Sequence, residues 1–149
     1  MSTRTFPEKS STKTIKTSRL LGVGLLAVVA AVIANLIARA ILLAVLDLPA
    51  DFPPLQPPAI IFFTTIGTAL GALVYAILIR RSSRPARTFT TIAVVALVIS
   101  ILPNLGLMAN PAAAPFPGGS ALAFGALIVL HIVAALAAVL VLLGLTRSA

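Results

Sequence analysis

The sequence contains no cysteine and no tryptophan, and it has one histidine and three acidic residues among 149. Without cysteine the chain can form no disulfide and can offer no thiolate to a metal ion or as a nucleophile. A single histidine cannot complete a conventional structural zinc site. The sequence also lacks a visible nucleophile–base pair and a phosphate-binding loop. We therefore expect a protein that is not an enzyme and that holds no metal and no cofactor.

Charge is scarce as well, at 9% of residues, whereas hydrophobic residues make up 60%. Soluble domains carry about 25% charged and about 45–50% apolar residues. A chain of this composition cannot cover its core with polar surface in water. Four apolar runs are long enough to cross a bilayer, at about residues 20–46, 60–79, 89–107 and 121–145. The predicted fold class is all-α, a four-transmembrane-helix bundle formed by residues 20–146.

The formal net charge of +8 comes from basic residues beside the apolar runs, not from a nucleic-acid footprint. Apart from Arg39, they lie in residues 1–19, in residues 80–87 and at Arg147, whereas the loop after the first run carries Asp47 and Asp51 and the third loop is uncharged. The positive-inside rule then predicts a multi-pass protein of the cell membrane, with both termini and residues 80–87 in the cytoplasm. The expected partners are the lipid bilayer and, at residues 1–19 and 80–87, anionic lipid headgroups.

Residues 1–19 are rich in serine and threonine and show no apolar periodicity, which predicts a disordered basic tail. A basic tail before an apolar run is also typical of a signal peptide. Here hydrophobicity continues for several residues past Ala38-Arg39-Ala40. We therefore favour an uncleaved anchor, with a cleavable organelle-targeting tail as the alternative.

Arg39 interrupts the first apolar run, four residues after Asn35. Residues four apart share a face of a helix, and an arginine in a membrane span costs roughly 2.5 kcal/mol or more. Arg39 could snorkel toward the external surface and Asp47 and Asp51. Helical side chains lean toward the helix N-terminus, however, which directs Arg39 toward the depth of Asn35 and favours a position inside the bundle. Since a guanidinium only donates, the predicted partners are acceptors: Asn35, Asn104, threonine hydroxyls, backbone carbonyls freed by Pro103, water or an anion.

Further polar residues occupy the same half of the predicted membrane domain. With a rise of about 1.5 Å per residue, Arg39 lies about 12 Å below the external end of its span and His131 about 16 Å below that of the fourth. His131 is interpreted as a structural, hydrogen-bonded contact between helices, with a ligand role as the alternative. The hypothesis is an intramembrane polar cluster of Asn35, Arg39, Thr64, Thr65, Thr68, Ser100, Asn104 and His131.

Two local patterns carry further expectations. Gly67 and Gly71 have the GxxxG spacing that lets two helices approach closely. We expect them to pack inside the monomer in preference to a homo-oligomeric contact or a contact with another membrane protein. Pro103 lacks an N–H and is expected to kink or end the third helix.

Several short motifs lie along the chain after its tail: Asn35 in the first run, TTIGTALGAL at residues 64–73, Arg80-Arg81, Arg87-Thr88-Phe89, Ser100-Ile101-Leu102-Pro103 and His131-Ile132-Val133-Ala134-Ala135. Together they resemble a family of small four-span bacterial membrane proteins of unknown function, met often in actinobacteria and chloroflexi. The resemblance implies a four-helix membrane domain and no particular activity.

Three functions remain compatible with the sequence. The favoured one is a non-catalytic structural or regulatory membrane protein in which the polar cluster around Arg39 fixes how the helices pack. The alternative is a small transporter or channel component that binds an anionic or polar solute in an outward-opening pocket. The third, and least favoured, is an intramembrane enzyme.

Overall fold

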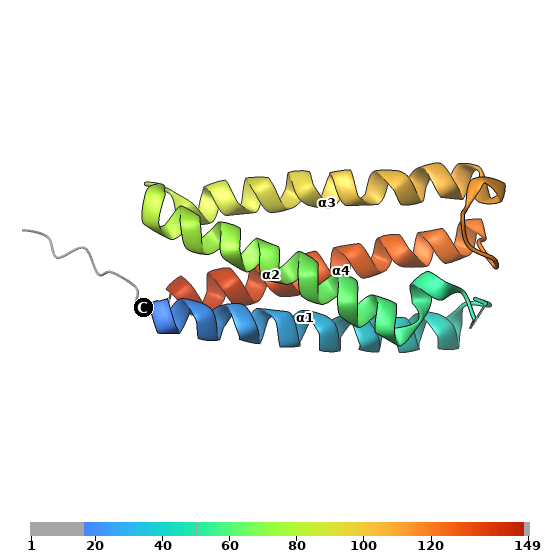
Figure 1. Ribbon diagram of the computed structural model, residues 1–149, viewed down its shortest axis with the longest axis horizontal. Helices are drawn as coiled ribbons and strands as arrows, with labels where there is room; N and C mark the ends of the chain where they lie inside the picture. The colour runs from blue at the N-terminus through green and yellow to red at the C-terminus, as the bar shows by residue number, and fades with distance from the viewer. Residues whose placement is uncertain (1–16, 50, 148–149) are drawn as a thin grey trace, which may run out of the picture.

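The structure is a computed structural model that describes residues 17–49 and 51–147. Four long helices follow one another along the chain: α1 (Thr17–Val45), α2 (Pro57–Arg81), α3 (Pro85–Ala109) and α4 (Ala121–Arg147). Two short 3-10 turns, η1 (Pro53–Leu55) and η2 (Pro111–Ala113), lie in the connections (Figure 1). The described residues contain no strand. The predicted all-α class with four helices is confirmed.

Each helix is long and apolar enough to cross a membrane. The shortest has 25 residues, which at about 1.5 Å per residue exceeds the roughly 30 Å hydrocarbon core of a bilayer. The protein is therefore a multi-pass membrane protein. The first helix begins at Thr17, so residues 17–19 belong to α1 and not to the predicted disordered tail, whose other residues lie outside the described part.

Of the two effects expected of Pro103, ending the third helix is wrong, because α3 continues to Ala109. Proline is tolerated inside membrane helices where nearby groups satisfy the polar atoms it leaves free. Nearby, Ser100 Oγ donates to the Leu97 carbonyl at 2.7 Å and Asn104 Nδ2 to the Ser100 carbonyl at 3.4 Å. Neither acceptor is the carbonyl of Ile99, the one that Pro103 leaves without its helical N–H donor.

The four helices form a bundle in which α1 packs against α2 and α4, and α3 packs mainly against α4. In Figure 1, α2 runs obliquely from beside α1 at its beginning toward α3 at its end. Helix α3 is the least buried of the four, with Phe89 and Asn104 as its only buried residues. Large apolar side chains face outward on all four helices, as expected where the surrounding solvent is lipid.

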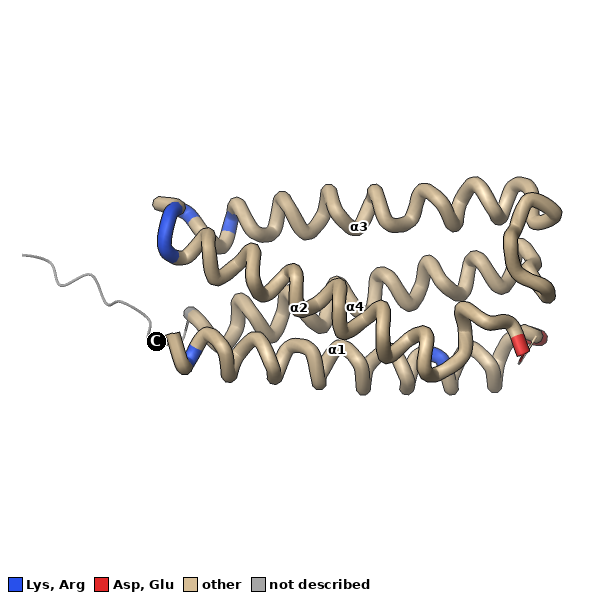
Figure 2. The backbone as a smooth tube through the Cα atoms, in the orientation of Figure 1, with Lys and Arg blue, Asp and Glu red and all other residues tan. Residues whose placement is uncertain are grey.

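The two ends of the bundle differ in charge (Figure 2). We call one the basic end, which carries Arg19, Arg80, Arg81, Arg84 and Arg87. The other is the acidic end, where the loop between α1 and α2 carries Asp47 and Asp51. Among the described residues, Arg39 is the one basic residue between these ends, on α1.

Helices α1 and α2 pack closely at one pair of small residues, although not at those expected. A Cβ placed on Gly24 would lie 3.3 Å from the Cβ of Ala72. A Cβ on Gly67 or Gly71 would meet nothing within 4 Å, so the expectation that this pair packs inside the monomer is wrong. The buried positions Ile60, Thr64 and Thr68 define the inward face of α2, and Gly67 lies exposed away from it.

Candidate functional site

The Arg39 guanidinium is bound by the loop that follows its helix. Arg39 Nε donates to the Leu55 carbonyl at 2.6 Å, and the Arg39 side chain is half-buried. Leu55 is the last residue of η1, and Pro57-Pro58 begins α2 immediately afterwards. Pro58 has no N–H to donate to the carbonyl three residues before it. The proline pair thus leaves the Leu55 carbonyl without its nearest backbone donor, and Arg39 satisfies it.

The loop that carries Leu55 is packed into the acidic end as a hydrophobic plug. Phe52 is 0% exposed and Leu55 1% exposed, and both belong to one core cluster with Ala123 and Phe124 of α4. The rings of Phe52 and Phe124 meet edge to face, with centroids 5.5 Å apart, a favoured arrangement for aromatic pairs. The plug therefore holds the Leu55 carbonyl at the level of Arg39.

The loop between α3 and α4 supports this plug. Gly118 has φ +74°, a left-handed conformation that glycine adopts without strain. A Cβ on Gly119 would lie 3.1 Å from two ring atoms of Phe124. Only a glycine at position 119 lets the Phe124 ring sit in its place without displacing a neighbour.

Asn35 forms a polar contact between α1 and α2. Asn35 is 3% exposed, and its Nδ2 donates to Thr64 Oγ1 on α2 at 2.9 Å. Its Oδ1 is buried and accepts no hydrogen bond from the described residues. Unpaired buried polar atoms are costly, at roughly 1–3 kcal/mol each. The Asn35 amide is therefore half satisfied by the protein.

Arg39 has no carboxylate partner in the described part of the chain. Asp47 and Asp51 are both exposed at the acidic end, and the outward pairing weighed from the sequence is not formed. Beyond Nε, the guanidinium has four further N–H groups, and no hydrogen bond joins them to a described residue. Among the partners weighed from the sequence, the described part of the chain offers Arg39 a backbone carbonyl, but it is that of Leu55 and not one freed by Pro103.

The other predicted site residues are not joined to Arg39 or Asn35 by hydrogen bonds within the described residues. Ser100 and Asn104 bond carbonyls of α3 itself. His131 Nδ1 lies 2.7 Å from the Leu127 carbonyl of its own helix, and must carry the hydrogen because a carbonyl only accepts. Thr68 is buried and Thr65 half-buried. Of the eight residues, one pair, Asn35 and Thr64, is linked across helices, and a single shared site remains a prediction.

Sequence reasoning did not find the polar contact near the basic end. Tyr75 OH lies 2.7 Å from Thr146 Oγ1, and both residues are buried. Thr146 donates its one hydroxyl hydrogen to the Leu142 carbonyl at 2.6 Å, so Tyr75 is the donor to Thr146. The signal was available, because a tyrosine within a membrane span needs a partner for its hydroxyl.

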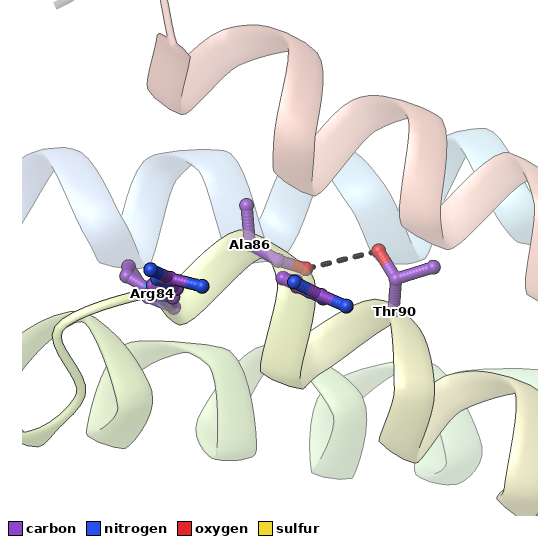
Figure 3. A pocket seen from close by; sticks show the side chains of 5 residues that line it. Arg84, Ala86 and Thr90 are labelled. Carbon is purple, nitrogen blue, oxygen red and sulfur yellow. Dashed lines mark hydrogen bonds between the residues drawn. The ribbon is translucent and has the colours of Figure 1, made fainter.

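A shallow pocket of about 360 Å³ lies at the basic end of the bundle (Figure 3). It is lined by Arg84, Pro85, Ala86, Arg87 and Thr90 at the start of α3. Figure 3 shows the Thr90 hydroxyl bonded to the Ala86 carbonyl, at 2.9 Å. Two guanidinium groups and no carboxylate line this pocket, which therefore suits an anion.

Comparison with known proteins agrees with the resemblance seen in the motifs. No curated protein and no solved structure matches the chain. A family model described as "Family of unknown function (DUF6069)" matches residues 15–149, which include all four helices. The chain therefore belongs to the DUF6069 family of unknown function.

Proposed function

We propose that this protein is a non-catalytic, structural or regulatory four-helix protein of the cell membrane, in which the polar groups inside the bundle serve to fix how the helices pack. The observation that carries the proposal is the bond from Arg39 to the Leu55 carbonyl. The costliest residue in the apolar core joins α1 to the plug and so to the beginning of α2. Asn35 and Thr64 add a second link between the same two helices.

The proposed orientation places the basic end in the cytoplasm and the acidic end outside. Its support is the separation of charge in Figure 2, with the arginines at one end and the described aspartates at the other. Loops rich in arginine are retained on the cytoplasmic side of membranes. The basic end then faces the leaflet that is rich in anionic lipids.

The substitution Arg39→Met tests the architectural role. It leaves the buried Leu55 carbonyl without a donor, and hydrogen bonds to charged groups contribute about 1.5–3 kcal/mol. We expect the free energy of unfolding in detergent to fall by about 1–3 kcal/mol, while solute flux through liposomes containing the full chain stays at the level of the unsubstituted protein. Arg81→Met, at an exposed position at the end of α2, is the matched control and should leave stability unchanged.

A small transporter or channel component for an anionic or polar solute is the second candidate. Two observations favour it: the four N–H groups of Arg39 without a described acceptor, and the Asn35 Oδ1, to which no described residue donates. In this case the unsubstituted protein conducts a solute such as chloride or phosphate, and Arg39→Met abolishes that flux while stability is kept. That result would replace the architectural proposal with the transport one.

A further inference from the structure

We propose that the pocket at the start of α3 binds the phosphate of an anionic phospholipid, whose acyl chain lies along the exposed apolar ridge of the same helix. This inference goes beyond the architectural role and does not depend on the contact of Arg39. It concerns the opposite end of the bundle, and it assigns to Arg84 and Arg87 a ligand that the rest of the chain does not supply.

The first support is that the two arginines of the pocket are not engaged with the protein. Arg19 Nη2 donates to the Leu145 carbonyl at 3.2 Å, and Arg80 Nη2 donates to Thr17 Oγ1 at 2.9 Å. The guanidinium groups of Arg84 and Arg87 make no hydrogen bond or ion pair with any described residue. At the basic end, therefore, Arg19 and Arg80 bond other helices, whereas Arg84 and Arg87 line the pocket with guanidinium groups that no described residue engages.

The second support is the lining of the pocket. Its other members are Pro85, Ala86 and Thr90, and the Thr90 hydroxyl hydrogen is already directed at the Ala86 carbonyl (Figure 3). The lining thus offers two cations, a small apolar floor and no acidic group. Paired guanidinium groups favour phosphate because their planar N–H donors can each engage two of its oxygens.

The third support distinguishes a lipid from a free anion. Arg87 is followed along α3, at spacings of three and four residues, by the exposed positions Thr91, Val94, Val98 and Leu102. These positions form one ridge on a helix, and the last three of them are more than half exposed. A phosphate held at Arg87 is therefore followed directly by an uncovered apolar track. A basic pocket followed by an apolar surface matches a phospholipid, which has a charged headgroup followed by a hydrocarbon tail.

The experiment titrates the detergent-solubilised full chain with phosphatidylglycerol, with phosphatidylcholine of the same acyl chains, and with inorganic phosphate, and follows binding by native mass spectrometry or by the shift in Tm. The site variants are Arg84→Gln and Arg87→Gln. Arg81→Gln is the matched control, because Arg81 is an exposed arginine of the same loop region that does not line the pocket. All three positions are exposed, and circular dichroism without lipid checks that each variant is folded.

We expect phosphatidylglycerol to bind more tightly than phosphatidylcholine, and each site variant to weaken that binding about tenfold or more, as for loss of a hydrogen-bonded charge. Arg81→Gln removes only surface charge, for which a loss of about fivefold or less is expected. Equal losses in all three variants would show attraction to diffuse charge and overturn the site. Binding of inorganic phosphate with the same dependence on Arg84 and Arg87 would overturn the assignment to lipid.

Discussion

Asn35 of α1 donates a buried hydrogen bond to Thr64 of α2, yet the carbonyl oxygen of the same side chain accepts none from the described residues. This half-used amide leads to an asymmetric prediction. Thr64→Val should lower the free energy of unfolding by about 1 kcal/mol, in the range of hydrogen bonds between membrane helices, because the whole amide is then left unpaired. The double variant Asn35→Leu/Thr64→Val should recover most of that loss, since paired removal is nearly neutral. Unfolding in detergent measures both, and a double variant less stable than Thr64→Val would contradict the idea.

Gly119 should not tolerate a side chain. In Gly119→Ala the new Cβ would lie 3.1 Å from the Phe124 ring and 3.2 Å from the Ala114 Cβ. Overpacking of this kind costs about 1–3 kcal/mol, and we expect the Tm to fall accordingly. Gly67→Ala is the control, because nothing lies within 4 Å of its Cβ position, and this helical change should be neutral or stabilising by up to about 1 kcal/mol. Equal effects at the two glycines would refute the proposed packing of the plug.

The hydroxyl of Tyr75 should couple energetically to Thr146. A double-mutant cycle with Tyr75→Phe and Thr146→Val isolates this bond, because the additional loss of the Thr146 bond to Leu142 cancels between the two sides of the cycle. We expect a coupling of about 0.5–1.5 kcal/mol. A coupling indistinguishable from zero would mean that the two hydroxyls are not bonded in the membrane protein.

The orientation can be read with single cysteines, since the natural sequence contains none to remove. Ser83→Cys places a thiol in the exposed turn at the basic end, and Ala112→Cys places one in the exposed turn η2 at the other end. In intact cells, a membrane-impermeant maleimide should label the cysteine at 112, and it should reach the one at 83 only after permeabilisation. The reverse pattern would show that the proposed orientation is inverted.

The architecture could be predicted from composition. An apolar segment that crosses the hydrocarbon must satisfy its own backbone hydrogen bonds, and an α-helix does so within a single segment. Apolar length located all four spans, with end shifts of a few residues. The ends of the helices were harder to predict from apolar length, since the polar residues Thr17 and Ser18 also belong to α1. The expectation that Pro103 could end the third helix was wrong, because α3 continues to Ala109 and membrane helices tolerate an internal proline.

The predicted cluster of eight residues stays a prediction, and among the described residues one pair of its members, Asn35 and Thr64, is bonded across helices. Periodicity correctly placed Asn35 and Arg39 on one inward face, but it carries no information about how far α2 is rotated about its own axis. That rotation decides that Thr64 faces Asn35 and that Gly67 faces outward. The partner of Arg39 is a backbone atom of Leu55. Since every residue has a carbonyl, only the three-dimensional path of the loop could select this one.

The contact between Arg39 and Leu55 also has a consequence for the order in which the protein is made. The acceptor lies 16 residues after the arginine in the chain, and Thr64 lies 29 residues after Asn35. During synthesis α1 emerges with its guanidinium and its amide before either partner exists. Both groups are bonded only in the hairpin formed by α1, the plug and α2. The polar groups of the first helix are therefore satisfied by the protein only after the second helix has been made.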